Sequence, residues 1–209
     1  MFDAGKIADM ILWIPPILLA LTVHEFFHGY VAFRLGDPTA KHEGRLTLNP
    51  LKHLDPLGTI ALVIFHFGWA KPVPVNPYYL RNPRRDMIFV ALAGPLSNLA
   101  MAILFGILVK FNYMGMVSYP EVLFKMLVFG MYINVILMAF NLIPIPPLDG
   151  SKILFGLTDI SDQNQMMLQR FGPMILIGII FLGNMTGFSI LSIIISPFLS
   201  VFRAIFMGV

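Results

Sequence analysis

Two histidines and a glutamate lie close together in the apolar segment "LLALTVHEFFHGYVAF", residues 18–33. Residues four apart share one face of a helix, so His24 and His28 can point at a single cation. Glu25 lies beside them and can accept and release a proton. This H-E-x-x-H spacing predicts a metal site suited to hydrolysis by a metal-activated water. The alternative is a hydrogen-bonded cluster between helices that holds no metal.

A catalytic zinc site usually has three protein ligands and one open position, so a third ligand must come from elsewhere. The sequence favours Asp149, in "FNLIPIPPLDG" at residues 140–150. Prolines 144, 146 and 147 cannot continue a helix, so the chain should unwind there and turn Asp149 back towards the histidines. The alternative is an ordinary turn aspartate. Rival ligands lie in the preceding loop: Asp37, His42, Glu43, His53 and Asp55.

The elements that must position these residues are membrane helices. Of 209 residues, 57% are apolar and 12% are charged, which leaves too little polar surface to cover a soluble core. Four stretches are long enough to cross a bilayer: residues 10–33, 87–109, 122–143 and 173–195. Residues 57–69 and 197–209 are shorter, and we expect them to be re-entrant, interfacial or kinked. Within the first of these segments, His66 should be a hydrogen-bonded core residue.

The chain has no cysteine, which excludes disulfides, thiolate ligands and a thiol nucleophile.

Residues 34–86 form the most irregular part of the chain and hold eight of its 14 Lys and Arg residues. The positive-inside rule therefore places this region in the cytoplasm and the N-terminus outside. Residues 1–9 do not resemble a cleavable signal, so we expect the first span to be retained. "EGRLTLNP" (43–50) and "KPVPV" (71–75) alternate apolar residues with polar residues or proline. They predict short edge strands, which could hold an unwound substrate.

The expected fold is therefore an all-α polytopic membrane protein, with four long helices, one or two short apolar segments and short strands in the cytoplasmic loop. We expect a single domain over residues 1–209, with a catalytic core at about 10–155 and C-terminal helices at 173–209. Nothing in the charge pattern suggests nucleic-acid binding.

Three motifs occur in order along the chain: "HEFFH" in the first span, "GPLSN" at residues 94–98, and "NLIPIPPLDG" at residues 141–150. Together they resemble the site-2 protease family of intramembrane zinc metalloproteases. "AKPVPVNP" (70–77) is similar to its small bacterial and archaeal members, which lack PDZ and CBS domains. The resemblance therefore implies a prokaryotic cell membrane as the location. The Lys and Arg counts place the active site towards the cytoplasm.

The resemblance implies that His24, His28 and Asp149 bind one Zn²⁺ per chain and that Glu25 is the general base. It also implies a place near the scissile peptide for Asn141, and less strongly for Asn98. The alternative for both asparagines is hydrogen bonding between helices.

The implied activity is hydrolysis of a peptide bond within, or at the edge of, a transmembrane helix of a substrate protein in the bilayer, as in regulated intramembrane proteolysis. A metal-ion transporter or sensor, or an inactive scaffold that binds helices, would use the same ligands. The intact Glu25 favours the protease. A transporter would need a continuous polar path, whereas the outer halves of the spans are almost devoid of polar residues.

Overall fold

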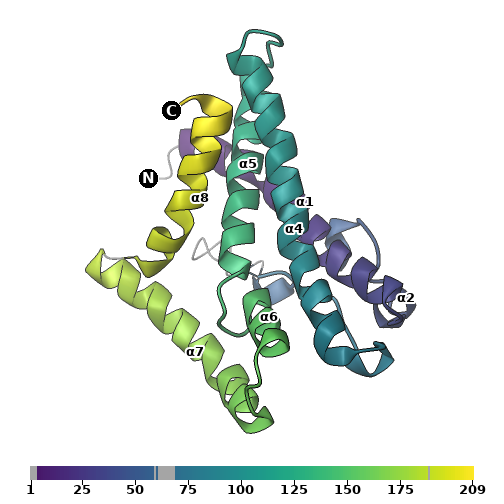
Figure 1. Ribbon diagram of the computed structural model, residues 1–209. Coiled ribbons are helices and arrows are strands. Elements are labelled where there is room, and N and C mark those ends of the chain that lie inside the picture. Colours follow the sequence, from purple (N-terminus) through teal and green to yellow (C-terminus); the bar gives the residue numbers. More distant parts are fainter. Residues whose placement is uncertain (1–3, 59, 61–68, 188) are drawn as a thin grey trace.

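The computed structural model describes residues 4–58, 60, 69–187 and 189–209, and confirms an all-helical membrane protein (Figure 1). Five described helices contain a segment long and apolar enough to cross a membrane. They are α1 (Ala4–Arg34), α4 (Pro83–Tyr113), α5 (Glu121–Asn141), α7 (Asp162–Thr186) and α8 (Ile190–Met207). Shorter elements connect them: α2 (Thr39–His42), the 3₁₀ turns η1 (Pro50–Lys52) and η2 (Pro77–Tyr79), and α6 (Asp149–Leu157).

The C-terminal region contains two spanning helices where the sequence predicted one long span and a short segment. The predicted span at 173–195 runs across a break between α7 and α8. Gly187 ends α7 with a left-handed backbone (φ 72°), and the Ser189 side chain accepts a hydrogen bond from the Ser192 amide at the start of α8. The predicted short segment 197–209 is therefore largely the second half of α8. The other short segment, 57–69, lies mostly outside the described residues.

The predicted loop strands are wrong for the part of the chain that the structure describes. Residues 43–49 form turns, bends and irregular backbone, Pro50 begins η1, and residues 71–76 have no regular secondary structure and pair with no strand. The nearest approach to a sheet is an isolated bridge between Leu54 and Ala70. Pro72 and Pro74 have no N–H, and the Val73 and Asn76 amides donate to the side chains of Glu25 and Asp37. The backbone groups that a ladder needs are therefore absent or already used.

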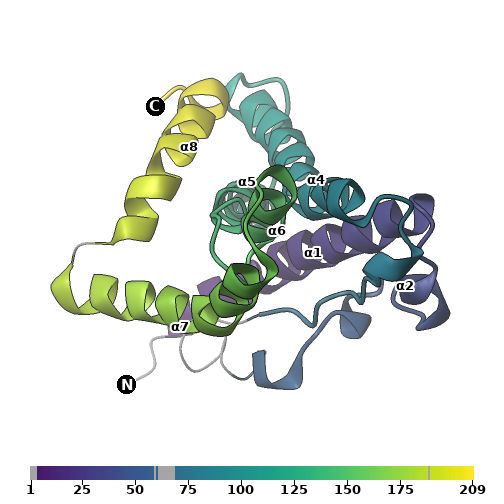
Figure 2. The same cartoon turned by 60° about the horizontal axis from the view of Figure 1, so that its bottom comes forward.

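Helices α1, α4 and α5 form the bundle that carries the site (Figure 1). Helix α4 packs against α1, α5 and α6, so it lies beside every element that supplies a candidate ligand. Helix α8 packs its Phe202 on Ala102, Met131 and Val135 of α4 and α5. Helix α7 leads away from the bundle and meets α8 at an angle (Figure 2).

Candidate metal centre

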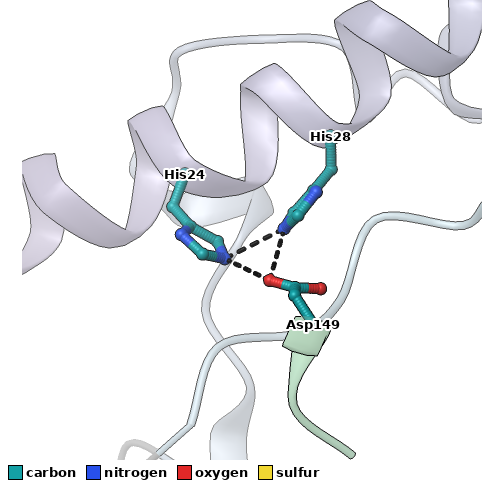
Figure 3. Close-up of side chains that lie close together, drawn as sticks. All are labelled: His24, His28 and Asp149. Carbon is teal, nitrogen blue, oxygen red and sulfur yellow. Dashed lines mark hydrogen bonds and ion pairs between the residues drawn. The ribbon is translucent and has the colours of Figure 1, made fainter. Parts of the chain in front are cut away.

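The predicted ligands meet in one buried cluster (Figure 3). His24 and His28 project from the same face of α1, and Asp149 faces them from the first turn of α6. The two Nε2 atoms are 2.9 Å apart, and they lie 3.2 Å (His24) and 3.0 Å (His28) from Oδ2 of Asp149. All three residues are at most 7% exposed. Among the described residues, these three form the group of histidine and acidic side chains whose geometry could hold a metal ion.

The cluster fits a zinc ion in its spacing and its donor atoms. Zinc bonds of about 2.0–2.1 Å put tetrahedral ligand atoms about 3.3 Å apart, close to the observed separations. Nδ1–H of His28 donates to the Val90 carbonyl at 2.7 Å, which leaves Nε2 with a free electron pair. Electron pairs that face one another at these distances repel unless a cation lies among them. Two imidazoles and one carboxylate leave a fourth position for water or substrate.

The turn before α6 brings Asp149 to the histidines. Helix α5 ends at Asn141, and Ile143 and Leu148 of the turn pack with Leu176 of α7. Gly150 lies so close to the Leu142 and Ile143 carbonyls that a Cβ would collide with both. Here glycine is required by close backbone approach.

The surroundings of Asp149 favour its ionised form. Burial raises the pKa of its carboxyl, whereas the adjacent Lys152 ammonium lowers it. Nζ of Lys152 lies 3.1 Å from Oδ1. The other carboxylate oxygen, Oδ2, points at the two histidines. A carboxylate binds metal in its ionised form.

Glu25 is held by the irregular segment 71–76. The Val73 amide donates to Oε2 of Glu25 at 2.8 Å. Two side chains fix that segment: Nη2 of Arg45 donates to the Lys71 carbonyl at 2.7 Å, and the Asn76 amide donates to Asp37 at 2.7 Å. A loop far from α1 in sequence therefore orients the carboxylate beside the cluster.

The rival ligands do not join the cluster in the described part of the chain. Asp37 is fully buried and accepts from Thr39 and Asn76, while Nε2–H of His53 donates to the Thr47 carbonyl. His42 and Glu43 are exposed, and Asp55 accepts from the Gly58 amide. His66 lies outside the described residues.

The two asparagines expected near the scissile peptide have different surroundings. Asn98 is fully buried, and its Oδ1 is 2.6 Å from Nδ1 of His24. Asn141, half-buried at the end of α5, donates to the Leu137 carbonyl of its own helix. Sequence reasoning gave no role to Asn134, which contacts Asn98. Its signal was an amide side chain in the middle of an apolar span.

Comparisons with known proteins relate the chain to zinc metalloproteases. The model of "Peptidase family M50" matches residues 113–183, which include Asp149. A Bacillus subtilis protein provisionally named zinc metalloprotease YwhC is 44% identical over 142 residues, covering 66% of this chain and 65% of that protein.

Two further relatives are more distant. Rip2 of Mycolicibacterium smegmatis is 36% identical over 146 residues (67% of this chain, 54% of the relative), and MJ0611 of Methanocaldococcus jannaschii is 35% identical over 136 residues (63% and 62%). Both are also provisionally named zinc metalloproteases. The chain spans between about half and two thirds of these relatives, and no solved structure matches it significantly. The matches confirm the resemblance found in the sequence: residues 113–183 are similar to peptidase family M50, and about two thirds of the chain is similar to relatives named as zinc metalloproteases.

Proposed function

We propose that the protein is a zinc metalloprotease that hydrolyses a peptide bond within, or at the edge of, a transmembrane helix of its substrate. The observation that carries this proposal is the buried cluster of His24, His28 and Asp149, with Glu25 next to it on a helix that can span the membrane. An ionisable group at membrane depth costs a few kcal/mol unless it is paired or bound to an ion. A cluster of such groups therefore marks a functional site. The family and the names of the relatives support the same activity.

In the proposed mechanism His24, His28 and Asp149 would hold zinc, and zinc bound there would supply Lewis-acid chemistry for the scissile carbonyl and for the attacking water. Glu25 accepts the proton of that water and passes it to the leaving amine. The Val73 amide keeps the carboxylate in place by donating to Oε2. Asn141, at the end of α5, remains a candidate contact for the substrate backbone.

We further propose that the site opens towards the cytoplasm. His24 precedes the end of α1 by ten residues, which is about 15 Å of helix. Residues 34–86, from the end of α1 to the start of α4, hold eight of the 14 Lys and Arg residues, so the positive-inside rule assigns this region to the cytoplasm. The substrate is then a membrane protein in the surrounding bilayer, and its helix must unwind to expose a carbonyl. The proposed catalytic core is residues 10–155 of a single domain.

Glu25→Gln tests the proposal directly. It retains the shape of the side chain and all three ligands, so zinc content should remain near one per chain while cleavage of a transmembrane reporter falls by a factor of about 100 or more. Both quantities should be measured on the same purified samples. Reduced zinc binding in Glu25→Gln would point to a transport or sensor site, and cleavage at the wild-type rate would refute the general-base role.

A further inference from the structure

Two buried asparagines connect His24 to the far side of the bundle. Asn98 of α4 and Asn134 of α5 are both fully buried. Oδ1 of Asn98 is 2.6 Å from Nδ1 of His24, and Nδ2 of Asn98 is 2.8 Å from Oδ1 of Asn134. Nδ2 of Asn134 is in turn 2.8 Å from the Gly130 carbonyl. The result is a continuous chain of hydrogen bonds from a backbone group of α5 to the imidazole.

The direction of this chain is fixed by its far end. A backbone carbonyl can only accept, so the group of Asn134 that faces Gly130 must be its NH₂, and its oxygen must face Asn98. Asn98 then has to present its own NH₂ to Asn134. The Ala20 carbonyl agrees with this orientation but is the weaker partner, since it lies 3.3 Å from Nδ2 of Asn98, compared with 2.8 Å for the Asn134 oxygen. The oxygen of Asn98 must therefore face His24, which has to donate from Nδ1–H.

We propose that Asn134, acting through Asn98, sets the tautomer of His24 and thereby the affinity of the site for zinc. With the proton on Nδ1, the free electron pair is on Nε2, the atom that faces His28 and Asp149. The Val90 carbonyl does the same for His28 directly. Asn134 is a positioning residue, and Asn98 is engaged with His24 and its neighbours, so it is not available to a substrate. This inference rests on the metal site of the proposed function.

Partners of this kind orient a metal-bound histidine, and losing one typically weakens metal binding 10- to 100-fold. Asn134→Leu removes the oxygen that holds the Asn98 amide, so we expect a loss of zinc affinity within this range. Asn134→Asp should keep most of the affinity. In an apolar core its carboxyl is neutral, so its O–H can donate to Gly130 while the other oxygen still accepts from Asn98.

Asn141→Leu is the matched control. Asn134 and Asn141 lie on the same helix, and each donates from Nδ2 to the carbonyl four residues earlier. In the described residues only Asn134 also accepts from Asn98. The experiment is a chelator competition that measures the zinc dissociation constant of the full chain, purified in detergent, for the wild type and the three variants.

The inference predicts a 10- to 100-fold weaker affinity for Asn134→Leu, with Asn134→Asp and Asn141→Leu within about threefold of wild type. Equal affinities for Asn134→Leu and Asn141→Leu would overturn it. If Asn134→Leu does not fold, ¹⁵N NMR of histidine-labelled wild type decides, because a proton on Nε2 instead of Nδ1 of His24 would also overturn it. Failure of the wild type to bind zinc would instead refute the proposed function, and the two failures are thus distinguishable.

Discussion

Gly94 faces the two histidines from α4, where even a methyl group has no room. A Cβ built at this position would be 2.6 Å from Nε2 of His24 and closer still to Nε2 of His28. These are the two nitrogens that would bind zinc, so the methyl would intrude on the space that the ion needs.

We therefore expect Gly94→Ala to lower zinc content to well below one per chain and to abolish cleavage. Gly178→Ala is the control, because a Cβ at that position on α7 meets no atom within 4 Å. Metal analysis of both purified variants gives the result. Full zinc occupancy in Gly94→Ala would contradict the assignment of the cluster as the metal site.

Val73 offers a test of how Glu25 is held. Val73→Pro removes the N–H that donates to the carboxylate, and a hydrogen bond to a charged group is worth about 1.5–3 kcal/mol. We expect the rate of cleavage to fall about tenfold or more with zinc content unchanged. Val73→Ala keeps the amide and controls for the loss of side-chain packing, so it should be clearly more active. Equal rates for these two variants would show that the amide is not needed.

The local part of the site could be predicted, and the distant part only in outline. His24, Glu25 and His28 follow from helical periodicity within five residues. Asp149 depended on placing two helix ends on the same side of the membrane. The bond from the Val73 amide could not be predicted, because a backbone N–H leaves no mark in the sequence and the segment pattern suggested a strand.

At the scale of elements, the turn between α5 and α6 decides whether Asp149 reaches the histidines. Gly150→Ala would press a methyl group against the Leu142 and Ile143 carbonyls. Overpacking of this kind costs about 1–3 kcal/mol, and here the strain can be relieved by moving α6 and its carboxylate. We expect the zinc dissociation constant to rise by about 5- to 150-fold, while Gly178→Ala stays at the wild-type value. A chelator competition measures both dissociation constants. An unchanged constant in Gly150→Ala would contradict the prediction, because it would show that the turn can accommodate the methyl group without displacing Asp149.

The elements themselves were predicted unevenly for physical reasons. Three of the long spans appear near their predicted positions, since uninterrupted apolar length alone identifies them. The break at Gly187 was missed because residues 173–195 are apolar on both sides of it. The strand prediction was wrong because an alternating apolar pattern indicates only which side chains face a surface. Strand pairing also needs a neighbouring segment with free backbone N–H and C=O groups.

At the scale of the whole molecule, the metal would link two distant parts of the chain. His28 and Asp149 are 121 residues apart in sequence. A ligand that binds only the folded state stabilises it by about 2.7 kcal/mol at 100 times its dissociation constant. We expect chelation to lower the midpoint of thermal unfolding in detergent, and added zinc to restore it. Asp149→Ala should show no such dependence, and a wild-type midpoint insensitive to zinc would argue against the link.

This separation also has a consequence for synthesis. At about 5–20 residues per second, the 121 residues between His28 and Asp149 take about 6–24 s to translate. During that interval the nascent chain already carries both histidines and Glu25 but lacks the third ligand. With the centre assembled as proposed, the emerging polypeptide passes through the insertion machinery without a complete active site. Helices that are being inserted beside it are therefore not exposed to its activity until most of the chain has been made.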